Sequence, residues 1–136
     1  MRAQNEPARC RIIGRIPPAE VAKHYQAASL FCLPTHLEAF GISFIETMHH
    51  ALPAVGTDLG AIPDFVIEDQ TGYRVRVGDV DGLTRVLDGL LSAPEEMQRL
   101  GQNALKLARE RYTWEKVGSR LGAHFREALA EAATSV

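Results

Sequence analysis

The chain has few cysteines, and the two it has are not spaced as a pair. Its 136 residues include only Cys10 and Cys32, and neither belongs to a C-x-x-C motif. This usage excludes a disulfide framework and indicates a reduced, cytoplasmic protein. Because both cysteines lie in apolar runs, we expect them to be inert core residues.

Long apolar runs and an excess of one charge are also missing. No run approaches the roughly 20 residues that cross a bilayer, and residues 1–8 contain no apolar stretch typical of a signal peptide. With Lys+Arg 15 and Asp+Glu 17, the formal net charge is −2, which argues against a protein that binds nucleic acid. The length suits one domain. We expect a single domain over residues 1–136, ordered from about 9 to 126, with flexible ends.

Four short apolar runs predict strands. They are Cys10–Ile13, Ser29–Leu33, Ala54–Thr57 and Tyr73–Val77. The second run is apolar at every position after Ser29, which is typical of a strand covered on both faces of a parallel sheet. The fourth run alternates apolar and charged residues, which predicts a half-exposed edge strand.

Helical spacing fills the intervals between the predicted strands and the rest of the chain. It predicts helices that begin near Pro17, at Ile42, at Ile62 and at Asp81. A capping-box pattern, Ser92-Ala-Pro-Glu95, predicts the start of the next helix, and Thr113 is expected to cap the last one. Alternating strands and helices predict an α/β fold. Its core would be a partial doubly wound, Rossmann-like parallel sheet of about four strands, followed by a helical carboxyl-terminal end.

The segment Pro34–Met48 is the candidate functional segment, because it begins where a predicted strand stops and ends inside a helix. Ligands of open parallel sheets bind outside the carboxyl ends of the strands. Gly41 permits close approach of the backbone to a ligand. The unpaired amides at the start of the helix suit a phosphate, and they belong to Phe40, Gly41, Ile42 and Ser43.

Two glutamates flank these amides: Glu38 precedes the helix, and Glu46 lies about one turn into it. Two carboxylates beside an anion site repel the anion unless they accept hydrogen bonds from hydroxyl groups on either side of it. A nucleotide diphosphate-sugar has such hydroxyls, on its ribose at one end and on its sugar at the other. The alternative is that Glu46 is a solvated helix residue and Glu38 is only a favourable charge near a helix N-terminus. For glutamates eight residues apart in general, this alternative is the more common one.

The stretch Glu38-Ala-Phe-Gly-Ile-Ser-Phe-Ile-Glu46 resembles the E-x7-E element of retaining glycosyltransferases with the GT-B fold, especially those of glycosyltransferase family 4. The following segments resemble further family elements in the same order: Glu46-Thr-Met-His-His-Ala-Leu-Pro53, Gly56-Thr-Asp-Leu-Gly60-Ala-Ile-Pro-Asp64, Asp69-Gln-Thr-Gly72 and Tyr112-Thr-Trp114-Glu. The similarity runs from about Cys10 to Phe125. Ala51 and Ala61 stand where the family has glycine.

The resemblance implies a role for each matched residue. Glu38 would be the catalytic residue facing the transferred sugar, together with the amides of Ala39 and Phe40. The diphosphate would bind to Gly41 and Ile42. The ribose hydroxyls would donate hydrogen bonds to Glu46, and the base would lie beside Arg15 and Ile16. The implied reaction is a metal-independent, retaining glycosyl transfer from a nucleotide diphosphate-sugar with no cofactor, in which helix amides stabilise the leaving group.

The resemblance covers only the later part of the family's donor domain. An acceptor domain and the first two donor-domain strands, whose loop supplies an Arg and a Lys to the diphosphate, have no counterpart here. We therefore expect the chain to be inactive alone. A non-catalytic binding or interaction module, derived from a glycosyltransferase half and acting with a partner chain, is the alternative.

The missing strands would leave two edges open. In the strand order 3-2-1-4-5-6, the missing strands are numbers 1 and 2. They would lie between strand 3, which is Cys10–Ile13, and strand 4, which is Ser29–Leu33. Because natural proteins avoid open strand edges, we expect these two strands to pair directly, or a second chain to fill the gap. The apolar side of the final helix would also be uncovered, which predicts a homodimer contact.

A metal site is an alternative interpretation of the same helix. Glu46, His49 and His50 have E-x-x-H and E-x-x-x-H spacing, and His36 lies in the adjacent loop. Successive helical residues project about 100° apart, so His49 and His50 do not readily share one ion with Glu46. We therefore expect no native metal site.

Overall fold

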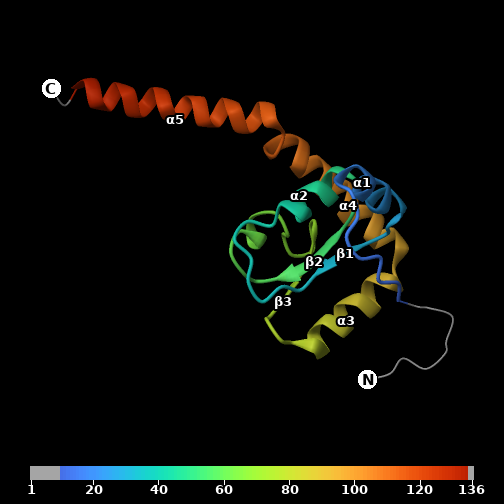
Figure 1. Cartoon of the computed structure of the whole chain (residues 1–136). Helices are drawn as coiled ribbons and strands as arrows, with labels where there is room; N and C mark the ends of the chain where they lie inside the picture. The colour runs from blue at the N-terminus through green and yellow to red at the C-terminus, as the bar shows by residue number, and fades with distance from the viewer. Residues whose placement is uncertain (1–9, 135–136) are drawn as a thin grey trace.

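The computed structural model describes residues 10–134, so the expectation about residues 1–8 lies outside the described part. Figure 1 shows its elements. In chain order they are α1 Pro18–Ala27, β1 Phe31–Leu33, α2 Ile42–His49, β2 Ala54–Thr57, the short 3₁₀ helix η1 Ile62–Asp64, β3 Gly72–Val75, α3 Val80–Leu91, α4 Pro94–Arg111 and α5 Trp114–Thr134. The single-domain organisation and its ordered range stay predictions, although α5 continues beyond residue 126.

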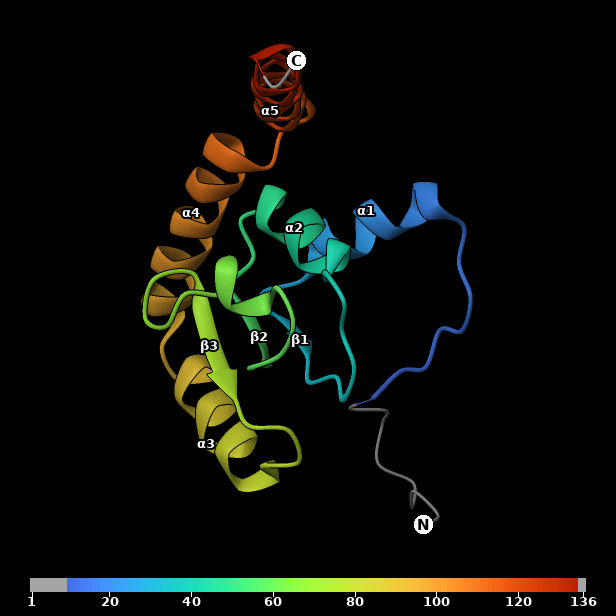
Figure 2. The same ribbon diagram turned by 90° about the vertical axis from the view of Figure 1, so that its left-hand side faces the viewer.

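The three strands form one parallel sheet in the order β1-β2-β3. The register aligns Phe31 with Ala54 and Ala54 with Gly72. Strand β2 lies in the centre, and all four of its residues are buried. Parallel strands joined by helical crossovers confirm the predicted α/β, Rossmann-like architecture. In Figure 2, α2 lies above the sheet, and α4 rises beside β3 from its contact with α3.

Helices cover both faces of the central strand, so the sheet separates two apolar clusters. Ala54 belongs to the first cluster, with residues of α2, the η1 segment and the second half of α4: Phe44, Met48, Ile62, Phe65, Val66, Ala104 and Ala108. Val55, the next residue along β2, belongs to the second cluster with Leu90 of α3 and Leu100 of α4. Successive strand side chains point to opposite faces, which explains why β2 is buried along its whole length.

The sheet has one strand fewer than expected, because Cys10–Ile13 does not form a strand. The side chain of Ile12 is 92% exposed. The prediction that this segment pairs directly with the next strand is therefore wrong. A strand requires a neighbouring strand to satisfy its backbone groups. The segment has no neighbouring strand among the described residues, and it leads through Gly14 directly into α1.

Strand β1 is less buried than its apolar sequence predicts. Phe31 and Leu33 are half-buried, whereas Cys32 is exposed. The expectation that both cysteines are core residues is wrong, because Cys10 is exposed as well. The fully buried strand is β2, whereas β1 is an edge strand of the described sheet, with a neighbour only on its β2 side.

The starts of α4 and α5 show which of the two predicted helix caps forms. Ser92 does not open α4; it ends α3, and α4 follows Ala93 without a side-chain cap. Pro94 occupies the first position of α4, where a missing N–H costs no hydrogen bond. Thr113 does cap α5, because its Oγ1 accepts a hydrogen bond from the amide of Lys116 at 3.3 Å. The capping-box prediction is wrong and the Thr113 prediction is confirmed.

Helix α5 extends away from the body of the molecule, as Figures 1 and 2 both show. Its apolar side is exposed, as expected: Trp114 is 91% exposed and Phe125 62%. None of the helices in residues 10–134 is long and apolar enough to cross a membrane. Since α5 contacts chiefly the end of α4, its apolar side remains uncovered by the rest of the described chain.

The end of α2 contains a strained residue. The amide of Ala51 donates to the Met48 carbonyl and the amide of Leu52 to the Thr47 carbonyl, which is the Schellman pattern of a helix C-terminus. This pattern places Ala51 at φ 56°, in the left-handed region that glycine adopts without steric cost.

We therefore expect Ala51→Gly to raise the free energy of unfolding by about 1 kcal/mol, because it relieves the left-handed strain of an L-residue. Thermal or urea unfolding followed by circular dichroism measures the gain. Ala61→Gly is the matched control, because Ala61 has φ −89° and gains no relief. An Ala51→Gly variant no more stable than Ala61→Gly would contradict the explanation.

Candidate functional site

The predicted loop leaves β1 at the carboxyl edge of the sheet and turns sharply into α2. Gly41 is the residue before α2 and has φ 87° and ψ 50°. A Cβ at this position would lie 3.0 Å from Phe44 Cδ2 and 3.1 Å from Phe65 Cζ. Both its left-handed backbone and the packed rings around it therefore require glycine. The helix start is fixed in direction by this buried turn.

The first amides of α2 are not used in hydrogen bonds within the described residues. Among the described residues, no acceptor is hydrogen-bonded to the amides of Phe40, Gly41, Ile42 or Ser43, whereas the Phe44 amide donates to the Gly41 carbonyl at 3.0 Å. Unpaired amides at a helix start carry partial positive charge. The sequence prediction of an anion-binding helix start is consistent with this geometry.

The loop that follows β2 packs directly against the loop that follows β1. Gly60 has φ 53°, and a Cβ there would lie 2.3 Å from the Glu38 carbonyl oxygen. On the same side, Thr57 Oγ1 donates a hydrogen bond to the Thr35 carbonyl at 2.8 Å. Two loops are thus held together at the carboxyl edge of the sheet by residues that are 22 positions apart in the chain.

Glu38, Ala39 and Phe40 lie in this paired loop. Glu38 is half-buried, and Ala39 is exposed. The Phe40 ring packs edge-on against Phe65, with centroids 6.2 Å apart, yet 48% of Phe40 remains exposed. The loop therefore presents one carboxylate residue and backbone amides beside an aromatic side chain that is only partly covered.

Glu46 lies on the exposed side of α2 and faces α1. Its Oε2 accepts a hydrogen bond from the Tyr25 hydroxyl at 3.1 Å. A cavity of about 270 Å³ lies at this contact, lined by Val21, Ala22, Tyr25, Glu46, His49 and His50. Burial, and then the bond to the Glu46 carboxylate, raise the pKa of Tyr25 above its ordinary value. The sequence indicated Glu46 but not this partner.

Tyr25 lies on α1 and belongs to none of the motifs named above. A tyrosine on an apolar helix side offers a hydroxyl that needs a partner when the ring is covered. That signal was present in the sequence, but the identity of the partner depends on how α1 and α2 pack.

Arg15 and Ile16 are not joined to the rest of the candidate site. They precede α1, with Arg15 exposed and Ile16 half-buried. Within residues 10–134, no hydrogen bond or ion pair connects either of them to the loop after β1 or to Glu46. Their placement beside a base stays a prediction.

The histidines of α2 do not complete a metal site. His49 and His50 line the same cavity as Glu46, but His50 packs its ring against Tyr25 at a centroid distance of 5.6 Å. In the described part of the chain, no three His, Cys, Asp or Glu side chains are arranged to hold a metal ion. The expectation that the chain has no native metal site stays a prediction.

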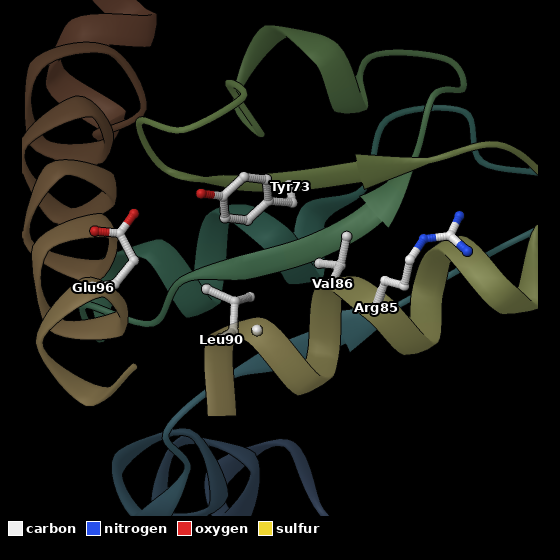
Figure 3. A pocket seen from close by; sticks show the side chains of 6 residues that line it. Tyr73, Arg85, Val86, Leu90 and Glu96 are labelled. Atoms are coloured by element: carbon white, nitrogen blue, oxygen red, sulfur yellow. The ribbon is translucent and has the colours of Figure 1, made fainter. Parts of the chain in front are cut away.

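A second cavity, of about 340 Å³, lies between β3, α3 and α4. In Figure 3 Tyr73 and Glu96 lie at one end and Arg85 at the other, with Val86 and Leu90 between them. Tyr73 is near the amino end of β3, so this cavity lies away from the strand ends that hold the candidate site.

At the Glu96 end of this second cavity, Asp69, Glu96 and Arg99 pair with one another. Arg99 Nη2 donates to Asp69 Oδ1 at 2.9 Å, and Arg99 Nε donates to Glu96 Oε2 at 2.8 Å. Hydrogen bonds from the Arg99 guanidinium hold the pKa of Glu96 below its ordinary value. The cluster ties α4 to the loop before β3, which is a structural role.

Comparison with known proteins assigns the chain to a family. The family model of glycosyl transferases group 1 matches residues 2–107. The chain belongs to this family. It is 36% identical over 115 residues to MMP alpha-(1→4)-mannosyltransferase of Mycolicibacterium hassiacum, covering 84% of this chain and 28% of that protein.

Solved structures agree with the family and the fold. The C-terminal domain of a glycosyl transferase group 1 family protein, LpcC from Francisella tularensis, is similar with a TM-score of 0.70 and 27% identity, over 75% of this chain and 53% of that one. HepE of Anabaena, solved in complex with UDP-glucose, has a TM-score of 0.72 at 17% identity, over 77% of this chain and 29% of that one, and shows the fold alone. This chain is therefore a carboxyl-terminal part of a GT-B glycosyltransferase. It spans about a quarter of the length of the curated relatives that it matches.

Proposed function

We propose that this glycosyltransferase chain binds the nucleotide diphosphate-sugar donor of a retaining glycosyl transfer. In this proposal Glu38 and the amides of Ala39 and Phe40 face the transferred sugar, and Gly41 and Ile42 bind the diphosphate. Glu46 accepts hydrogen bonds from the ribose hydroxyls, with Arg15 and Ile16 beside the base.

The observation that carries the proposal is the free helix start of α2 at the carboxyl edge of the parallel sheet. Its amides have no acceptor among the described residues, and the buried Gly41 turn fixes their direction. A helix start of this kind is a site for phosphate groups, and its place at the strand ends is where α/β folds bind ligands.

The chemistry follows from the groups that are present. When the sugar–phosphate bond breaks, negative charge develops on the leaving diphosphate, and fixed amide dipoles stabilise that charge without reorganising. Glu38 would stabilise the positive charge that develops on the sugar. The scheme requires no metal ion or cofactor.

Glu46→Ala tests the proposal. We expect wild-type chain to bind at least one of UDP-glucose, GDP-mannose and ADP-glucose, and the variant to bind it about tenfold more weakly or worse, because a charged acceptor of hydroxyl groups is lost. Ligand-observed NMR or calorimetry with the 136-residue chain measures the affinities.

Glu115→Ala serves as the matched control, because it removes the same carboxylate from the exposed first turn of α5. Its affinity should equal that of the wild type. Equal binding by Glu46→Ala, or no binding of any of the three donors by the wild type, would contradict the proposed function.

Turnover is proposed to require more protein than these 136 residues, because the chain spans about a quarter of the length of its relatives. A non-catalytic module that acts with a partner chain is the alternative, and the exposed apolar side of α5 favours it. A sugar-transfer assay with a co-purified partner separates the two: catalysis restored by the partner supports the transferase, and a stable but inactive complex supports the module.

A cytoplasmic location and a homodimer or partner chain on the open side of the molecule stay predictions. The uncovered apolar side of α5 supports the second of them.

A further inference from the structure

The contact between α1 and α2 contains a polar link that none of the motifs includes. Tyr25 projects from α1, and its hydroxyl donates to Glu46 Oε2 at 3.1 Å. The tyrosine ring is itself held in place: it packs edge-on against Phe31 of β1, with centroids 6.3 Å apart, and lies 5.6 Å from the His50 ring. The hydroxyl thus approaches Glu46 from a fixed position.

Glu46 has no other fixed partner in the described part of the chain. It lies on the exposed side of α2, and a glutamate side chain has several rotatable bonds whose freedom is lost when it binds a ligand. An ionised carboxylate offers about four acceptor positions on two oxygens. One bond from Tyr25 therefore leaves acceptor positions on both oxygens.

We propose that Tyr25 is a positioning residue for nucleotide-sugar binding: its hydroxyl holds the Glu46 carboxylate so that the remaining acceptor positions receive the two neighbouring hydroxyls of a ribose. The inference rests on the proposed function. Two vicinal hydroxyls require two acceptors at a fixed separation, and a carboxylate held in advance meets that requirement without losing further freedom on binding.

The cavity beside the link is consistent with this role. Its volume is about 270 Å³, which is near the lower limit of pockets that enclose a whole ligand. It suits one part of a ligand, such as a pentose, and it has Glu46 and Tyr25 among its polar lining groups.

The first measurement compares Tyr25→Phe with wild type for the donor that the wild type binds. Loss of one hydrogen bond should weaken binding about fivefold, with unchanged circular dichroism because the ring is retained. Tyr25→Phe in a Glu46→Gln background should cause no further loss. Tyr112→Phe is the matched control, because its hydroxyl donates to the Asp64 carbonyl, away from α1.

The second measurement needs no ligand. Tyr25 is labelled at the phenol carbon and titrated by NMR in wild-type and Glu46→Gln chains. Burial and the Glu46 carboxylate together raise the pKa of Tyr25, so removing the carboxylate should lower that pKa towards its ordinary value. A structural tyrosine without this contact would titrate identically in both chains.

The outcomes separate the two proposals. Equal donor binding by wild type and Tyr25→Phe overturns the positioning role while the proposed function stands. A Tyr25 titration unaffected by Glu46→Gln overturns the link itself. If the wild type binds none of the donors, the proposed function fails and the positioning role fails with it, even where the titration shows that the contact exists.

Discussion

Gly101→Ala is expected to destabilise the protein by about 3 kcal/mol, the upper range of overpacking costs. A Cβ at Gly101 of α4 would lie 2.0 Å from the Ala51 carbonyl oxygen and 3.3 Å from Pro53 Cδ. Backbone atoms cannot rotate away as a side chain can, so α4 must separate from α2. These two helices enclose the first apolar cluster, and their separation would expose it.

Denaturant unfolding followed by circular dichroism measures this loss. Gly89→Ala in α3 is the matched control, because a Cβ there would meet nothing within 4 Å. That variant should gain about 0.5–1 kcal/mol, since alanine favours a helix more than glycine does. Equal effects of the two substitutions would show that α2 and α4 do not pack as closely as the structure indicates.

Gly60→Ala is expected to abolish most of the donor binding while the fold persists. Its Cβ would lie 2.3 Å from the Glu38 carbonyl oxygen and 3.1 Å from the Ala39 carbonyl oxygen. Relief of this collision must displace the loop that carries Glu38. A shift of about 1 Å at a functional group is enough for a loss of tenfold or more.

Gly78→Ala separates this displacement from simple backbone strain. Gly78 also has positive φ, 79°, but a Cβ there would meet nothing within 4 Å. Both variants should lose about 1–2 kcal/mol of stability from the left-handed conformation, and only Gly60→Ala should lose donor affinity. Calorimetry with the donor, beside thermal unfolding, gives both quantities, and equal affinities would contradict the contact between the two loops.

Local sequence signals located most of the elements that matter for the site. The apolar runs before Pro34 and after Pro53 marked β1 and β2, and the turn at Gly41 marked the start of α2. These signals succeed because a strand's apolar content and a glycine's φ are properties of a few adjacent residues. The Thr113 cap is confirmed for the same reason.

Two local sequence patterns gave wrong predictions, because other segments of the chain decide the structure at those residues. Cys10–Ile13 has the composition of a strand but no strand beside it, and Ser92 has the spacing of a capping box although α3 continues through Leu91. The first segment lacks a partner strand among the described residues, and Ser92 is used to end α3, which leaves Ala93 as the residue before α4.

By itself, the order of apolar runs, glycines and paired glutamates determined the parallel α/β class, the place of the helix start proposed to bind an anion, and the family resemblance. Only the tertiary structure decided that Gly60 lies against Glu38, that Gly101 lies against Ala51, and that Tyr25 donates to Glu46. Those contacts join residues 21 to 50 positions apart, and non-local distances of that kind follow from how helices pack on a sheet.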